Sequence, residues 1–124
     1  PICTGPVEWR GPSSVKAFEF ARSVASKPVK AVIPGAFTFA SLSVDEHYDD
    51  IKDFTLAIAR VLAQEAFELE AAGAKHIQID EPALLDAPEY ERLKGYQVSW
   101  RISLAPQPPR AVVSVGQAYL EQQP

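Results

Sequence analysis

The chain is organised around the segment His76-Ile77-Gln78-Ile79-Asp80-Glu81-Pro82-Ala83-Leu84. Ile77 and Ile79 alternate with polar neighbours, which predicts a short strand over 76–80 that is buried on one face. The strand stops at an acidic pair, Asp80 and Glu81, followed by a proline. Carboxylates at the carboxyl end of a strand are how barrel enzymes present charge to a ligand. The alternative is that Asp80 only caps the next turn while Glu81 faces water.

A long amphipathic helix is predicted before this strand. Ser43-Val44-Asp45-Glu46 fits a capping box, with a hydroxyl at the N-cap and a carboxylate three residues later. The helix should begin there and run nearly to Gly73. Its inner face is predicted to consist of Ile51, Phe54, Ile58, Val61, Leu62, Glu65 and Leu69. Glu65 is the exception in an otherwise apolar stripe. A short connection then leads into the 76–80 strand, as in α/β units.

The rest of the chain also alternates between helical and strand patterns. The predicted elements are a helix between Gly11 and Pro28, a strand at 29–33, a loop at 34–38, a short helix at 89–94 and a candidate strand at 111–115. Repeated βα units predict a parallel sheet, which must be covered on both faces or closed into a barrel. We therefore expect an α/β fold of parallel βα units, forming a partial (β/α)8 TIM barrel over residues 1–95. Residues 96–124 form a tail without an assignment.

Composition excludes several classes of function. The chain has 124 residues, of which 47% are hydrophobic and 23% charged, as in a globular domain or part of one. Its net charge of -4, with no basic block, argues against nucleic acid or an anionic membrane as partner. No apolar run reaches the roughly 18 residues of a membrane span and no signal peptide is recognisable, so a cytoplasmic location is expected. Cys3 is the single cysteine, which excludes an internal disulfide and a cysteine-pair zinc site in this chain.

Four segments carry a family resemblance. They are Pro28-Val29-Lys30, Ile33-Pro34-Gly35-Ala36-Phe37-Thr38, Leu69-Glu70-Ala71-Ala72-Gly73-Ala74 and Ile77-Gln78-Ile79-Asp80-Glu81-Pro82-Ala83-Leu84. Together they resemble the cobalamin-independent methionine synthase family, in particular its C-terminal catalytic barrel or the stand-alone relatives of that domain. The resemblance covers residues 27–86, with a weaker match from residue 1 and none after Gly95. It implies a (β/α)8 barrel and, in methionine biosynthesis, methyl transfer from methyltetrahydrofolate to the thiol of homocysteine. It also implies a zinc ion that holds the thiolate, and no cobalamin.

The resemblance implies roles for individual residues. Asp80 stands where the family's Asp binds the homocysteine ammonium, and a strand-end carboxylate in a poorly solvated pocket pairs well with an ammonium. Asp86 stands at a carboxylate position of the folate site, but it is one methylene shorter than the usual Glu. Glu81 and Thr38 are further expected substrate contacts, although a hydroxyl in a turn also satisfies backbone groups. Where the family carries a Trp against the folate, this sequence has Leu42, which offers no aromatic stacking face.

The zinc ligands implied by the resemblance are missing from this sequence. In the family they begin with a His-x-Cys pair on the next strand, joined later by a Glu and a second Cys. No His follows His76 and no Cys follows Cys3. Because a catalytic zinc site needs three suitable protein ligands, the zinc expected for the complete enzyme must be held outside this chain.

The remaining candidate residues each have a structural alternative. His76 begins its strand, at the opposite end from Asp80, and is expected to be structural. His47 is expected in the first turn of the long helix, either near a ligand or as a solvated surface residue. Cys3 is expected to fill the core. Tyr48 is either a lid residue or an aromatic on the helix surface.

Three functions therefore remain open at the level of sequence. The first is a segment of a zinc-dependent methyltransferase of the methionine synthase type, inactive as the isolated chain. The second is a related barrel that uses another donor or thiol, such as a uroporphyrinogen decarboxylase-like protein or a corrinoid or coenzyme M alkyltransferase; Leu42 and Asp86 favour it. The third is a non-catalytic truncated product. In each case an open partial barrel exposes strand edges, so self-association is expected.

Overall fold

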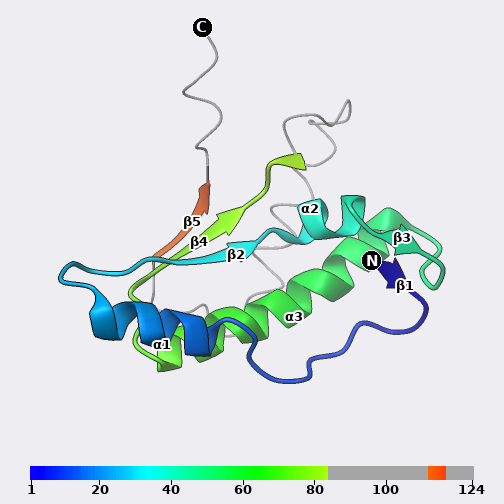
Figure 1. Cartoon of the computed structure of the whole chain (residues 1–124). Helices are drawn as coiled ribbons and strands as arrows, with labels where there is room; N and C mark the ends of the chain where they lie inside the picture. Colours follow the sequence, from blue (N-terminus) through cyan, green and yellow to red (C-terminus); the bar gives the residue numbers. More distant parts are fainter. Residues whose placement is uncertain (84–111, 117–124) are drawn as a thin grey trace, which may run out of the picture.

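The described part of the chain, residues 1–83 and the backbone of residues 112–116, alternates between strands and helices in a computed structural model (Figure 1). In chain order the elements are β1 (Ile2–Cys3), α1 (Val15–Val24), β2 (Ala31–Pro34), α2 (Ala36–Ser41), β3 (Val44–Asp45), α3 (Ile51–Ala71), β4 (His76–Asp80) and β5 (Val112–Gly116). The strands form two sheets, one with the order β2-β4-β5 and one that pairs β1 with β3. All of these pairings are parallel, so the expected α/β class with parallel βα units is confirmed.

β4 lies in the middle of the larger sheet, and its neighbours end level with it. Pro34 of β2 is opposite Asp80, and Asp80 is opposite Gly116 of β5. β5 is the strand proposed at 111–115, and it comes from the part of the chain that the sequence left unassigned. Because all three strands are parallel, their carboxyl ends share one edge of the sheet, where a barrel fold places its ligands.

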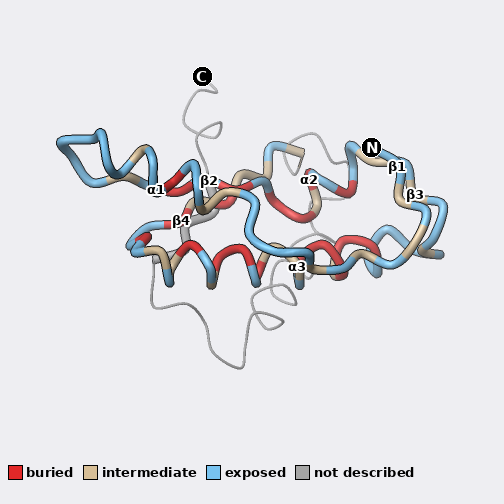
Figure 2. Tube along the Cα trace, turned by 60° about the horizontal axis from the view of Figure 1, so that its bottom comes forward, coloured by how far each residue is buried: buried red, intermediate tan, exposed pale blue. Residues whose placement is uncertain are grey.

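α1 and α3 lie on the same side of this sheet (Figure 1). Between them and β2 and β4 is an apolar cluster of Phe18, Ala31, Ile33, Ala66, Leu69, Ala74, Ile77 and Ile79. Leu69 and Ile77 are 0% exposed, and burying a side chain of this size contributes roughly 1.5–3 kcal/mol. Buried positions recur along α3 (Figure 2), as the amphipathic pattern of the sequence predicts, but Ile51 of the predicted inner face is 47% exposed.

The other face of the sheet carries the residues that alternate with this core. Val32 of β2 is 48% exposed, whereas Ile33 beside it is 3% exposed. Gln78 and Asp80 of β4 are half-buried on the same face as Val32. In a closed barrel this face lines the interior. The arrangement is therefore that of part of a (β/α)8 barrel, as the sequence predicts.

A second cluster joins α2 to the first half of α3. It consists of Ala36, Ala40, Phe54, Ile58 and Ala59. Small alanines opposite larger side chains let the two helices interdigitate. The Tyr48 ring stacks on Phe54 with its centroid 5.4 Å away, and the Tyr48 hydroxyl accepts the N–H of Val7 at 2.9 Å. Tyr48 therefore ties the N-terminal segment to this cluster.

The prediction of a loop at 34–38 is wrong, because α2 begins at Ala36. This helix is six residues long, and its N-cap Gly35 has no side chain to accept a hydrogen bond. Its first N–H groups are satisfied by a side chain far away in the sequence, so no local pattern indicates a helix here. The preceding strand is Ala31–Pro34 rather than 29–33.

The predicted start of the long helix is also wrong. α3 begins at Ile51, where the Asp50 carboxylate accepts the N–H of Lys52 at 2.9 Å, and not at Ser43. The middle of the supposed capping box, Val44–Asp45, is β3 and pairs with β1 from the start of the chain. The pairing of β3 with the distant β1 decides the structure here. A local four-residue pattern carries no information about that pairing.

Glu65, the charged residue on the inner stripe of α3, is 3% exposed and caps α1. Its carboxylate accepts the N–H of Ser13 at 3.0 and 3.1 Å, the N–H of Ser14 at 2.6 Å, and the Ser14 hydroxyl. Burial alone raises the pKa of Glu65, but the hydrogen bonds from Ser14 and Ser13 outweigh it and hold that pKa below its ordinary value. Glu65 therefore stabilises the start of α1 as an ionised group.

Two expectations are not tested by the described residues. The short helix predicted at 89–94 lies outside them, and the domain boundary at residue 95 stays a prediction. Within the described residues, no helix is both long and apolar enough to span a membrane.

Candidate functional site

The carboxyl ends of β2 and β4 meet where Asp80 and Glu81 stand. Pro34 is opposite Asp80, and the N–H of Gly35 donates to the Asp80 carbonyl at 2.6 Å. After these residues the chain enters α2 on one side and turns at Pro82 on the other. The acidic pair therefore lies beside the start of α2.

Glu81 serves as the missing cap of α2. One carboxylate oxygen accepts the N–H of Phe37 at 3.1 Å, and the other accepts the N–H of Thr38 at 2.8 Å. Both N–H groups lack partners within the helix, and negative charge is favoured at a helix N-terminus. A Cβ added to Gly35 would clash with Cδ of the Glu81 side chain. The side chain of Glu81 therefore crosses directly over a glycine backbone, and no larger residue fits at position 35 without moving it.

Thr38 adds a second link between α2 and the turn after β4, in which its side chain is the acceptor. Its Oγ1 accepts the N–H of Ala83 at 3.2 Å, and the residue is 8% exposed. Thr38 and Glu81 thus tie the turn after β4 to α2 and satisfy backbone groups on both sides. Their expected contact with substrate stays a prediction.

Asp80 points to different partners from Glu81, as alternation along a strand predicts. Its Oδ1 accepts a hydrogen bond from Nε2 of Gln78 at 2.6 Å, and Oε1 of Gln78 accepts one from Nζ of Lys30 at 2.5 Å. Sequence reasoning missed both Gln78 and Lys30. The spacing of two residues between Gln78 and Asp80 was the available signal, since it places them on one face of the strand.

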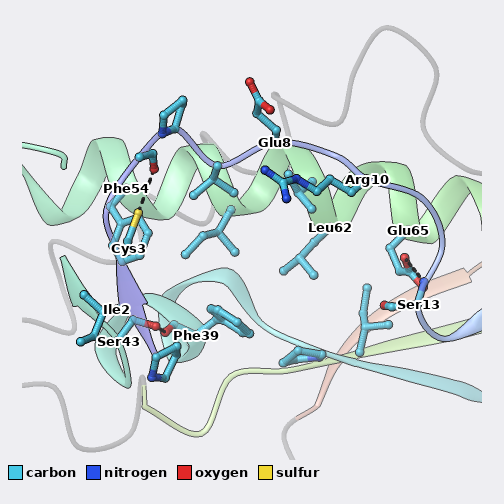
Figure 3. A pocket seen from close by; sticks show the side chains of 18 of the residues that line it. Ile2, Cys3, Glu8, Arg10, Ser13, Phe39, Ser43, Phe54, Leu62 and Glu65 are labelled. Atoms are coloured by element: carbon cyan, nitrogen blue, oxygen red, sulfur yellow. Dashed lines mark hydrogen bonds between the residues drawn. The ribbon is translucent and has the colours of Figure 1, made fainter. Parts of the chain in front are cut away.

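A pocket of about 650 Å³ lies between the N-terminal segment, β2 and α3 (Figure 3). Among its lining residues are Cys3, Phe39, Phe54, Leu62 and Glu65. Neither Asp80 nor Glu81 is among the described residues that line it. The carboxylate of Glu65 at its wall is already occupied by Ser13 and Ser14. The acidic strand end and this pocket are therefore separate features.

The two histidines and Cys3 lie on different segments of the chain. His76 is exposed at the start of β4, at the far end of the strand from Asp80, as expected. His47 is exposed in the turn before α3 and not in the first turn of that helix, which corrects the prediction. Cys3 is half-buried on β1, and its thiol donates to a backbone carbonyl at 3.2 Å. Asp86, the remaining candidate, lies outside the described residues.

These residues do not fit the zinc site that the family resemblance implies. β5, the strand that pairs with β4, reads Val112-Val113-Ser114-Val115-Gly116 and contains no His or Cys. In residues 1–83 and 112–116, no three His, Cys, Asp or Glu side chains are grouped so that they could hold a metal ion. No step involving zinc can therefore be assigned to the described residues of this chain.

A parallel sheet with helices packed on one face, and a carboxylate at the end of its middle strand, defines part of a barrel-type α/β enzyme domain. Comparison with known proteins identifies the kind of barrel. The family model described as "Cobalamin-independent synthase, Catalytic domain" matches residues 1–101. This chain belongs to that family, which confirms the resemblance seen in its motifs.

Individual relatives agree with this assignment. The chain is 39% identical over 104 residues to a 5-methyltetrahydropteroyltriglutamate–homocysteine methyltransferase of Streptococcus pneumoniae serotype 19F, and 39% identical over 103 residues to a methionine synthase of Saccharolobus solfataricus. Each match covers 82% of this chain. A solved structure of a B12-independent methionine synthase from Shewanella sp. W3-18-1, in complex with selenomethionine, matches with a TM-score of 0.81 and 28% identity over 93% of this chain.

The chain spans only a minor part of these proteins. It covers 14% of the streptococcal relative, 29% of the archaeal one and 33% of the solved chain. Family membership and fold are therefore established for this chain, whereas the activities that the comparisons name are those of the longer relatives.

Proposed function

We propose that this chain is a segment of a cobalamin-independent methionine synthase, a cytoplasmic enzyme that moves a methyl group from methyltetrahydrofolate to the thiol of homocysteine. The family and the names of its relatives support this reaction. The observation that carries the role of this segment is the position of Asp80, half-buried at the carboxyl end of the middle strand. In the complete enzyme a zinc ion would hold the thiolate through ligands outside this chain.

Asp80 is proposed to bind the ammonium of homocysteine. Its carboxylate uses Oδ1 for Gln78. Among residues 1–83, no hydrogen-bond donor is directed at its other oxygen, Oδ2. A charge-assisted hydrogen bond from a primary ammonium fits that oxygen. Glu81 is the weaker candidate, because both of its oxygens already accept backbone N–H groups.

A second function, in which the same fold acts on a thiol without an amine, has one observation in its favour. Leu42 is 72% exposed, and it stands where the family resemblance implies a Trp that packs on folate. An aliphatic side chain there cannot stack on a pteridine ring. The amine dependence of thiol binding distinguishes this alternative from the first.

The test is a titration of the ¹⁵N-labelled chain with homocysteine, followed by NMR at the Gly35 amide, which donates to the Asp80 carbonyl. Losing one partner of a desolvated charge pair typically costs about 2–5 kcal/mol, so Asp80→Asn should raise the dissociation constant roughly 30-fold or more. Asp49→Asn makes the same charge change at an exposed site and should have no effect. Unchanged binding by Asp80→Asn would refute the role of Asp80. Equal binding of a thiol without an amine would favour the alternative.

A further inference from the structure

Three polar side chains form a continuous hydrogen-bonded line on the open face of the sheet. They begin at exposed Lys30, just before β2, and pass through Gln78 to Asp80 on β4. The pairing of Val32 with Gln78 brings the two strands into this register. The line ends at the carboxylate that is proposed to bind substrate, and its other two members have no assigned role.

The chemistry of the two ends determines how the Gln78 amide must point. The Lys30 ammonium can only donate, so it selects the amide oxygen. The Asp80 carboxylate, when ionised, can only accept, so it receives the amide nitrogen. An amide free to rotate by a half-turn would present its oxygen to the carboxylate and repel it. Lys30 therefore fixes the orientation in which Gln78 donates to Asp80.

The intervening amide also keeps a resident cation away from the carboxylate. A lysine in direct contact with Asp80 would compete with the ammonium of a ligand, whereas the uncharged amide holds one oxygen without neutralising the group. Asp80 is thus immobilised before a ligand arrives, so the loss of side-chain freedom on binding is reduced.

We propose that Gln78 is a positioning residue that orients Asp80 for an ammonium ligand, and that Lys30 acts through Gln78 by fixing its amide. This inference rests on the proposed function of Asp80. It extends that function to the selectivity of the site. The hydrogen bonds among Lys30, Gln78 and Asp80 should strengthen the binding of thiols that carry an amine and not of those that lack one.

The experiment measures binding of homocysteine and of 4-mercaptobutanoate, its analogue without the amine, to the full chain by NMR titration. Gln78→Leu should weaken homocysteine binding about tenfold, the effect of about 1.4 kcal/mol and typical of losing one hydrogen bond to a charged group. Binding of 4-mercaptobutanoate should be unchanged. Lys30→Met should weaken homocysteine binding less, about threefold, because the amide still faces Asp80 part of the time.

The double variant provides the decisive comparison. If Lys30 acts only through Gln78, Lys30→Met should have no further effect when position 78 is already Leu. Equal losses for both thiols, or full additivity of the two changes, would overturn the inference. Should Gln78→Leu fail to fold, the exposed Lys30→Met variant still carries the test, and an unchanged preference for the amine would overturn the proposal.

The two proposals fail in different ways. If Asp80→Asn abolishes the preference for homocysteine while Gln78→Leu and Lys30→Met keep it, the positioning role is refuted and the proposed function stands. If the unaltered chain shows no preference for the thiol with an amine, both proposals are refuted.

Discussion

Replacing Glu65 by glutamine should destabilise the fold without disturbing its shape. The carboxylate is 3% exposed and receives the N–H groups of Ser13 and Ser14 together with the Ser14 hydroxyl. An amide of the same size keeps one acceptor oxygen but loses the charge. It also loses the favourable interaction with the N-terminus of α1.

The magnitude follows from the number of hydrogen bonds. Bonds to an ionised acceptor are roughly twice as strong as neutral ones, whose net value is about 1 kcal/mol. Weakening the bonds from two backbone N–H groups therefore costs about 2 kcal/mol. For a chain of this size that corresponds to a fall in melting temperature of roughly 8 °C. Glu65→Ala should cost about 3–4 kcal/mol, because it leaves the buried donors unpaired and opens a cavity.

The effect should depend on pH in a defined direction. Because the pKa of Glu65 is lowered in the folded state, the unfolded chain binds a proton more readily. The stabilisation is therefore complete above the usual glutamate pKa of about 4.3 and is lost as the pH falls through the lower folded value. Glutamine does not titrate, so the difference between the two proteins should be constant near neutral pH and shrink below about pH 4.

The assay is thermal unfolding followed by circular dichroism from pH 7 to pH 3. Glu68→Gln, in the same helix but exposed, is the matched control and should lie within about 0.5 kcal/mol of the unaltered chain. A difference between Glu65→Gln and the unaltered chain that stays the same down to pH 3 would show that the charge is not responsible. Equal effects of the two substitutions would remove the special role of Glu65.

Three further results are expected. Gly35→Ala should lower the melting temperature by displacing Glu81 from its cap, whereas Gly5→Ala, where nothing lies within 4 Å of the added Cβ, should not; equal melts would contradict the close approach. The purified chain should self-associate, because the outer edge of β2 has no partner strand among the described residues; light scattering that gives a monomer mass at all concentrations would argue against this. The chain should retain less than one zinc per molecule after dialysis, since its Cys and His residues lie on separate elements; a stoichiometric, tightly held ion would overturn that expectation.

Features that depend on local periodicity could be predicted from the amino-acid sequence alone. The alternation of Ile77 and Ile79 predicted β4 with its correct ends, and the helical stripe predicted most of α3. Both patterns arise because the apolar side chains are those that face the core. They can therefore be recognised without knowing which helices and strands pack beside them. The repeated order of strand and helix was enough to predict a parallel sheet and the barrel class. The four segments that carry the resemblance, the last of which contains Asp80-Glu81-Pro82, were together enough to predict the family.

The roles of the carboxylates, and the elements that depend on them, follow from the folded arrangement and not from local sequence. Glu65 caps α1 and Glu81 caps α2, in each case across more than forty residues of sequence. β3 forms because β1, at the start of the chain, pairs with it. Residues 44–45 are therefore a strand and not the start of a helix, although the sequence around Asp45 fits a capping box. A carboxylate has the same local sequence signal whether it meets water, a ligand or a helix N-terminus. The choice among these depends on which N–H groups the fold brings within hydrogen-bonding distance, and that is a property of the assembled sheet and helices.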